Sequence, residues 1–144
     1  MAKNDLQTLI RVRKWEVDEK QRGLAVLLRQ EESVIERQAA LESEIKREIE
    51  FTAEAPPEER FTFSAYLARC GDYRQQMDAM LQEIQRRISG VQEELGEAFR
   101  RLKPFEESQK KRDAEEEKEA GRLEQIELDE VGLNLHRRRA QRLL

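Results

Sequence analysis

The stretch that decides the fold is FSAYLARCGDYRQQMDAMLQEIQRRISGVQEELGEAFRRLKPF, residues 63–105. Alternating steps of four and three residues from Phe63 meet an apolar side chain at every position except Arg74. An apolar seven-residue repeat of this length predicts the narrow seam of a left-handed coiled coil. Such a seam is too narrow for a globular core and requires a partner helix. The seam residues are Phe63, Leu67, Cys70, Arg74, Met77, Leu81, Ile84, Ile88, Val91, Leu95, Ala98, Leu102 and Phe105.

Residues 4–52 supply that partner and read as a first helix, with Asn4 or Asp5 able to cap its start. Its seam has eight apolar positions of thirteen, and polar seam residues weaken a coiled coil but fix its register. The off-seam apolar residues Val12, Trp15, Leu28, Ile35 and Ile49 indicate either a heptad stutter or a second contact face. The seam residues are Leu6, Ile10, Arg13, Val17, Lys20, Leu24, Leu27, Glu31, Val34, Gln38, Leu41, Ile45 and Glu48.

A turn over residues 53–62 joins this helix to a second helix over residues 63–144. Pro56 and Pro57 remove two backbone donors and disfavour helix before them, and Thr62 or Ser64 can cap the second helix. We therefore predict an all-α fold, a long two-helix antiparallel coiled-coil hairpin forming one elongated domain over residues 1–144. An interior proline kinks a helix, so a kink is expected near Pro104.

The predicted hairpin leaves the end of the second helix without a partner. Folding at about residue 57 places residue i opposite roughly 114 minus i, so the first helix ends near residue 108. The seam turns polar at that point. Beyond it, Leu123, Ile126 and Leu133 resume an apolar stripe on a C-terminal helical overhang that nothing in the chain covers. The polar seam positions are Gln109, Arg112, Glu116 and Glu119.

Composition narrows the class of protein. Charged residues make up 40% of the 144 residues and aromatic residues 6%, which suits long solvated helices better than a globule. The net charge of -4 gives no general basic footprint for nucleic acid. One cysteine excludes an internal disulfide, and we expect a cytosolic protein without a signal peptide. No apolar stretch is long enough to span a bilayer, so membrane association should be indirect.

Residues with catalytic or ligand-binding chemistry are few. Cys70 and His136 are the only cysteine and histidine, and neither a glycine-rich phosphate loop nor zinc-ligand spacing is present. We read Cys70 as a seam residue and His136 as a surface residue. The sequence therefore predicts no enzyme activity, no metal site and no cofactor.

Two features stand out from a plain coiled coil. Tyr66, Tyr73 and Met80 are one heptad apart and each precedes a seam residue, so they form either additional core or a docking strip for a partner. The arginines near the C-terminus suit the negative end of a helix dipole, or an electrostatic contact with an acidic partner. Nucleic acid is the weaker choice for them, since the tail has no interleaved aromatics. These arginines are Arg137, Arg138, Arg139 and Arg142.

The sequence resembles the FliJ family, the coiled-coil stalk proteins of bacterial flagellar type III export. The resemblance covers nearly the whole chain and rests on the order and spacing of low-complexity motifs. These motifs are Leu6-Gln7-Thr8-Leu9, Glu16-Val17-Asp18-Glu19, the aromatic-rich Phe63 to Tyr73, Leu128-Asp129-Glu130 and the arginine tail.

The resemblance implies a hairpin similar to the γ stalk of rotary ATPases, in the cytoplasm at the inner-membrane base of the flagellum. Such a stalk inserts into the hexameric export ATPase ring, stimulates it, and links it to the cytoplasmic domain of the export gate membrane protein and to export chaperones. The implied gate-binding residues are Leu41, Tyr73, Met77, Met80 and Ile84. The implied ring-binding residues are Leu6, Trp15, Leu123, Ile126, Asp129, Glu130, Leu133, Arg137, Arg138 and Arg139.

The first helix departs from the family pattern. Past Leu41, where the family has aromatics, this chain has Glu44 and Glu48, or Ile45 and Ile49 if the register shifts. Stalk proteins of injectisome secretion systems share the expected architecture. A structural coiled coil that homodimerises through its C-terminal stripe is the alternative from another class, and a nucleic-acid-binding or prefoldin-like chaperone is a third.

Overall fold

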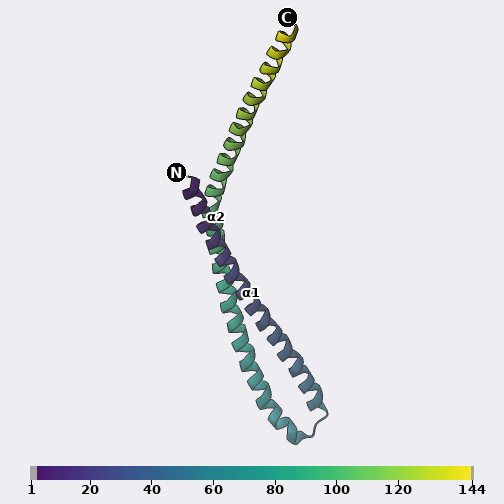
Figure 1. Cartoon of the computed structure of the whole chain (residues 1–144). Helices are drawn as coiled ribbons and strands as arrows, with labels where there is room; N and C mark the ends of the chain where they lie inside the picture. Colours follow the sequence, from purple (N-terminus) through teal and green to yellow (C-terminus); the bar gives the residue numbers. More distant parts are fainter. Residues whose placement is uncertain (1–2, 144) are drawn as a thin grey trace. The chain divides into compact units, whose positions relative to one another are not determined.

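The computed structural model describes residues 3–143, and nearly all of them are helical (Figure 1). Helix α1 is Lys3–Ala53 and helix α2 is Pro57–Leu143, and the described residues contain no strand. The two helices pack against each other as a helical hairpin. The predicted fold class, an all-α antiparallel coiled-coil hairpin, is confirmed.

The turn between the helices is shorter than the predicted residues 53–62, since only residues 54–56 lie outside a helix. The Ala55 N–H donates to the Thr52 carbonyl, and the Glu59 N–H donates to the Pro56 carbonyl, both at 3.1 Å. Pro57 suits the first position of α2 because its fixed φ is helical and an N–H there has no partner in any case. Pro57 thus starts the second helix, ahead of the predicted start at residue 63.

The predicted caps of the second helix are wrong for the same reason. Thr62 lies inside α2, where its hydroxyl donates to the Glu59 carbonyl at 2.8 Å, and Ser64 is likewise inside the helix. Glu58 and Glu59 instead place negative charge in the first turn, where the helix dipole favours it. In α1, Asn4 and Asp5 lie within the first turn, and the Asn4 carbonyl accepts a hydrogen bond from Thr8.

The chain divides into two compact units, where the sequence predicts one domain. One unit is Lys14–Phe99, and the other combines Met1–Arg13 with Arg100–Leu144. Each unit contains a piece of both helices, so each has its own pairing of α1 with α2. Within the first unit, Figure 1 shows the two helices side by side and joined by the short turn.

The core of the Lys14–Phe99 unit is the predicted seam. Val34, Ile84 and Ile88 form a buried cluster, and nearby seam residues are partly buried against it. Two predicted α2 seam residues in this unit are exposed, Leu67 and Arg74. Leu67 lies near the turn, where the α1 seam offers the charged Glu48 in place of an apolar cover. The partly buried seam residues packed on the cluster are Leu24, Leu27, Met77 and Leu81.

Polar residues of this unit pair across the two helices and reveal its register. Lys20 contacts Glu94 at 2.6 Å, and their numbers add up to 114. Gln38 donates to Asp78 at 2.8 Å, and Arg74 pairs with Glu42 through two hydrogen bonds of 2.5 and 2.7 Å, with numbers that add up to 116. The predicted register, residue i opposite roughly 114 minus i, is therefore confirmed within two residues.

The second unit pairs only the first turns of α1 with α2. Leu6 and Leu102 are buried, and the Arg13 guanidinium lies 5.9 Å from the centroid of the Phe105 ring, a cation–π distance. Arg112 is the last partly buried residue of α2, and every described residue from 113 to 143 is exposed. The predicted overhang is present, and it begins within a few residues of the expected position.

Helix α2 continues through Pro104 without a break. Proline removes one helical hydrogen bond and leaves the carbonyl four residues earlier, on Arg100, without its helical donor. Both Pro104 and Arg100 are exposed, so water can satisfy that carbonyl. The kink expected near Pro104 stays a prediction.

Candidate functional site

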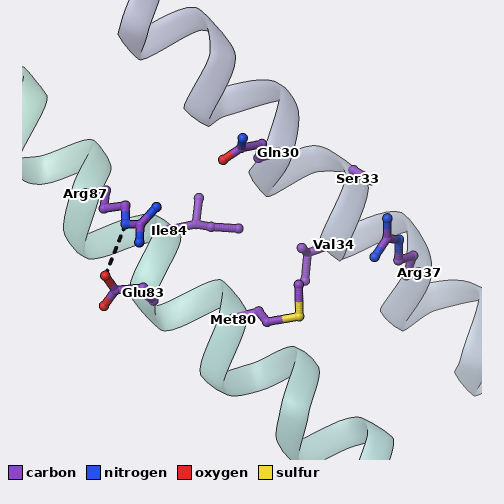
Figure 2. Close-up of a pocket in the computed structure, with 8 residues that line it drawn as sticks. All are labelled: Gln30, Ser33, Val34, Arg37, Met80, Glu83, Ile84 and Arg87. Carbon is purple, nitrogen blue, oxygen red and sulfur yellow. Dashed lines mark hydrogen bonds and ion pairs between the residues drawn. The ribbon is translucent and has the colours of Figure 1, made fainter.

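The candidate site is a groove between α1 and α2 in the Lys14–Phe99 unit, with a volume of about 370 Å³ (Figure 2). Val34 and Ile84 are buried seam residues, whereas Met80 is 46% exposed. The groove therefore combines apolar surface from the seam with an accessible thioether. The polar residues that line it are Gln30, Ser33 and Arg37 from α1, with Glu83 and Arg87 from α2.

Heptad geometry explains why these residues meet. Met80 directly precedes the seam residue Leu81, as Gln30 and Arg37 precede the seam positions 31 and 38. In an antiparallel pair, a residue that comes just before a seam residue on one helix lies beside the residues that come just before seam residues on the other helix. The heptad strip of Tyr66, Tyr73 and Met80 therefore lies along one side of the hairpin with the matching residues of α1.

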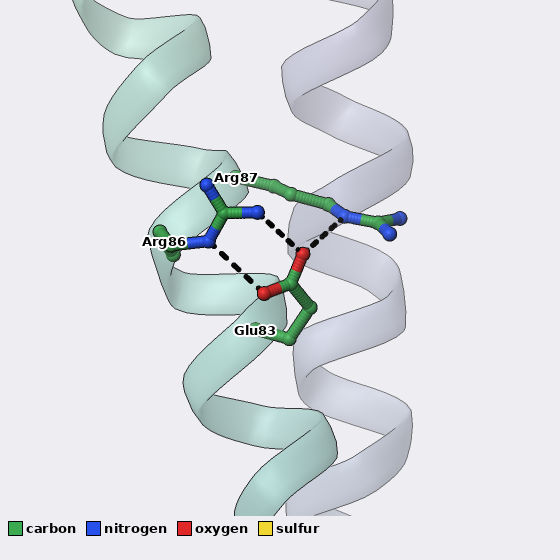
Figure 3. A network of polar contacts seen from close by, with 3 residues as sticks. All are labelled: Glu83, Arg86 and Arg87. Atoms are coloured by element: carbon green, nitrogen blue, oxygen red, sulfur yellow. Dashed lines mark hydrogen bonds and ion pairs between the residues drawn. The ribbon is translucent and has the colours of Figure 1, made fainter.

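Glu83 at the rim of the groove is held by two arginines of its own helix (Figure 3). Arg86 donates to both carboxylate oxygens at 2.7 and 3.0 Å, and Arg87 donates to one of them at 3.1 Å. These hydrogen bonds lower the pKa of Glu83 to about 2, so the carboxylate stays charged at a pH where an ordinary glutamate is protonated. On the other side of the groove, α1 contributes the cationic side chain of Arg37.

A smaller groove continues along the same hairpin and contains Leu41 and Met77. The polar contacts around it are the cross-helix pairs Gln38–Asp78 and Arg74–Glu42. The hydrogen bond from Arg74 lowers the pKa of Glu42, and the same bond raises the pKa of Arg74. The pair is thus ionised across a wide pH range, and it holds the two helices in register beside the groove.

Tyr66 differs from the other two members of its strip. Its ring stacks on Phe63 with centroids 6.0 Å apart, and its hydroxyl oxygen is buried. Burial, the Cys70 thiol and the Glu44 carboxylate raise the pKa of Tyr66 to about 12. Tyr66 is therefore part of the packing near the turn, while Tyr73 is 57% exposed. Of the two interpretations open for this strip, Tyr66 fits additional core and Tyr73 fits accessible surface.

The residues implied for gate binding form one neighbourhood in this unit. Ile84 is buried, and Leu41 and Met77 are partly buried along the seam. Tyr73 and Met80 are exposed beside them. Substitution of the seam residues would damage the hairpin itself, so Tyr73 and Met80 are the members of this set that are accessible at the surface.

The residues implied for ring binding fall into both units. Leu6 is only 2% exposed, so its side chain is packed and not accessible to a partner. Trp15, in the Lys14–Phe99 unit, is 60% exposed. The remaining residues belong to the bare part of α2 and are all exposed, namely Leu123, Ile126, Asp129, Glu130, Leu133, Arg137, Arg138 and Arg139.

The off-seam apolar residues of α1 resolve one open question. Val12, Trp15, Leu28, Ile35 and Ile49 are all exposed, by 45 to 60%. The buried residues follow the uninterrupted seam, so a heptad stutter is excluded, and a second contact face stays a prediction. In an antiparallel pair, residues that precede the seam on the two helices share one side of the hairpin, and residues that follow it share the other side. Met80 precedes a seam residue. The opposite side therefore carries Leu28, Ile35 and Ile49, each of which follows a seam residue.

Comparisons with protein-family models, with curated proteins and with solved structures found no match to this chain. Among the described residues, no cluster of three or more His, Cys, Asp or Glu side chains could hold a metal ion. Neither helix, over its described residues, is long and apolar enough to cross a membrane.

Sequence reasoning missed the α1 half of the groove. Gln30, Ser33 and Arg37 were not singled out, because polar side chains on a solvated helix carry no signal by themselves. The position before each seam residue could have identified Gln30 and Arg37 once the hairpin was taken as antiparallel. The sequence also offered a signal for Glu83, because two arginines follow it at the i+3 and i+4 positions, where side chains on a helix can pair.

Proposed function

We propose that this chain is the stalk component of a flagellar type III protein export apparatus. In this role it inserts into the hexameric export ATPase ring, stimulates ATP hydrolysis, and links the ring to the export gate and to export chaperones. It is not itself an enzyme. It acts in the cytoplasm and reaches the inner-membrane base of the flagellum through its partners.

One observation carries the proposal. Residues 113–143 of α2 form a helix that is exposed on every side, beyond the last seam contacts with α1. A solvated helix with exposed Leu123, Ile126 and Leu133 is unusual unless a partner covers it. The resemblance of the sequence to stalk proteins supplies that partner, the channel of the ATPase ring.

The chemistry of this segment suits a stalk. A single stalk in a six-fold ring cannot match every subunit, so its contacts should be polar, shallow and numerous. Asp129, Glu130 and the run Arg137 to Arg139 are exposed and charged, and apolar residues lie between them. An injectisome stalk would use the same design, and the gate protein that binds the chain distinguishes the two systems.

The test is deletion of residues 120–144. The paired seams end before that point, so the truncated chain should fold and melt like the full chain, as measured by circular dichroism. Stimulation of ATP turnover by the export ATPase should be lost, while binding to the cytoplasmic domain of the gate protein is retained. Equal stimulation by both forms would show that the bare segment is not the stalk tip.

A matched control keeps the segment and changes its charge. Reversal of Arg137, Arg138 and Arg139 to glutamate should weaken stimulation in a salt-sensitive way, because exposed charges are screened beyond ~8 Å at physiological ionic strength. Reversal of Lys103, Lys110 and Lys111, which are exposed on α2 before the bare segment, should have little effect. A purely structural coiled coil, the alternative function, would leave ATP turnover unchanged in all of these forms.

A further inference from the structure

The bare segment of α2, residues 113–143, carries an unusual division of charge. Its first part, residues 113–130, contains nine acidic and two basic residues. Its last part, residues 131–143, contains four arginines and no acidic residue. The two parts are therefore strongly opposite in sign, and they lie on one continuous exposed helix.

Apolar residues gather on one face where the charge changes sign. Leu128, Val131 and Leu135 repeat at steps of three and four residues, and each is between 53 and 58% exposed. Steps of three and four place such residues on one face of a helix. The same steps put Glu124 before them, and Arg138 and Arg142 after them, on that face. The apolar residues of this face thus lie between an acidic residue toward the N-terminal end of the helix and basic residues toward its C-terminal end.

This face differs from the stripe that the sequence made conspicuous. At 100° per residue, Ile126 and Leu133 point to the opposite side of the helix from Leu128 and Leu135. The bare segment therefore has two apolar faces. Both faces continue into acidic residues at one end and arginine at the other, but Glu130 interrupts the apolar run between Ile126 and Leu133. Only on the Leu128 face do three consecutive heptad positions carry apolar residues.

We propose that this face pairs in antiparallel fashion with the same face of a second copy of the chain. A two-fold axis near Val131 would place Leu128 of each copy beside Leu135 of the other. It would also place Glu124 of each copy beside Arg138 of the other. A parallel pair would instead place acid against acid and arginine against arginine, so the charges select the antiparallel arrangement.

This pairing goes beyond the proposed stalk function and has a consequence for it. A ring that surrounds the bare segment would need the surface that the dimer covers, so pairing and ring entry would exclude each other. A chain without its ring would then protect these apolar residues as a dimer, and the ring would compete for the monomer. Few apolar layers are available, so the dimer should be weak and dissociate readily.

Sedimentation velocity of the isolated full chain tests the pairing without reference to any ATPase. We expect association to become visible between about 10 and 500 µM, a weak affinity, because few apolar layers hold the pair together. It should weaken between roughly 0.1 and 1 M sodium chloride, because the Debye length falls from about 10 Å to about 3 Å. A chain that stays monomeric at the highest concentration in low salt would overturn the proposal.

Charge reversal tests the orientation. Substitution of Arg138 and Arg142 by glutamate should weaken association about tenfold or more, and so should substitution of Glu124 and Glu127 by lysine. Both sets together in one chain should restore association, because the antiparallel arrangement then again opposes unlike charges. In a parallel pair, like charges would face each other in the parent chain and also in the doubly reversed chain. If the single reversals do not weaken association, or if the double reversal does not restore it, the antiparallel arrangement is wrong.

Two controls separate pairing from other effects. Reversal of Lys103 and Lys110 to glutamate changes the net charge by the same amount as reversal of the two arginines. Both lysines lie outside the bare segment, so association should be unchanged. Circular dichroism should show that each reversed chain keeps its helices, since no reversed residue is buried. Because ATP turnover is not measured, loss of the stalk function and loss of self-pairing are distinguished by separate experiments.

Discussion

Helix α2 carries apolar heptads in two places, and only one of them is covered. Between Cys70 and Leu102 the apolar seam residues are buried or partly buried against α1. Between Leu123 and Leu135 similar spacing and similar residue types leave every side chain exposed. The difference lies in α1, whose described residues pair with the first region only. A heptad pattern thus predicts a contact face, while the length of the partner decides whether the contact is made.

The largest difference between the two regions should appear in stability. Ile88→Ala removes methyl groups from the buried cluster and should lower the free energy of unfolding by ~2–4 kcal/mol, through lost burial and a residual cavity. Leu133→Ala removes similar atoms from the bare segment and should cost less than about 0.5 kcal/mol. Urea unfolding followed by circular dichroism measures both at low protein concentration. Equal costs would mean that the bare segment is packed and that the contrast is wrong.

A smaller effect should separate surface contacts from seam residues within the Lys14–Phe99 unit. Tyr73→Ala together with Met80→Ala should weaken binding of the gate protein's cytoplasmic domain by ~1–3 kcal/mol, the range for apolar hot spots. The stability lost should be less than for Ile88→Ala, because both side chains are largely exposed.

The matched control for that pair is Ile35→Ala. Ile35 is also exposed and apolar, but it lies on the other flank of the α1 seam from the groove. Titration calorimetry should show unchanged gate binding for this variant. If the double variant melts as early as Ile88→Ala, Tyr73 and Met80 are core residues and their role as docking contacts is excluded.

Much of the fold could be predicted from the sequence because a two-helix hairpin is defined mainly by its register, that is, by which residues of the two helices lie opposite each other. The alternation of four and three residues predicted nearly every buried position, and the lengths of the two seams predicted where pairing ends. The turn was predicted too long, because proline was treated as a helix breaker when it also starts helices. Whether a proline ends a helix or starts one depends on whether the backbone N–H at its position would need a hydrogen-bond partner. The residue type alone does not reveal this.

The candidate site was only half predictable. Tyr73 and Met80 are conspicuous because they repeat with Tyr66 at exact heptad spacing beside the seam, whereas Arg37 resembles any other charged residue of a solvated helix. Its place beside Met80 comes from the antiparallel pairing of like heptad positions. Leu6 differs from Tyr73 and Met80. The resemblance implied a ring contact there, and its side chain is buried in the structure, so its part in ring binding stays a prediction.

The smallest expected effect concerns the polar pair that crosses the seam, Arg74 with Glu42. The hydrogen bond from Arg74 lowers the pKa of Glu42 below its ordinary value of 4.5. The pair therefore contributes its full stabilisation above that ordinary value and loses it as the pH falls through the lowered pKa. Both groups are solvated, so the contribution to stability is small and screened by salt.

Substitution of Arg74 by methionine isolates this contribution. An apolar residue completes the α2 seam, and Glu42 stays solvated when its partner is removed. The variant should therefore melt at or above the temperature of the parent at pH 7, because an exposed ion pair contributes little. Between pH 7 and pH 3 the parent should lose slightly more melting temperature than the variant, because only the parent loses the Arg74–Glu42 pair. Other carboxylates protonate in both chains and cancel in the comparison. Equal losses would mean that the pair contributes nothing, and that Lys20–Glu94 and Gln38–Asp78 suffice to hold the register beside the groove.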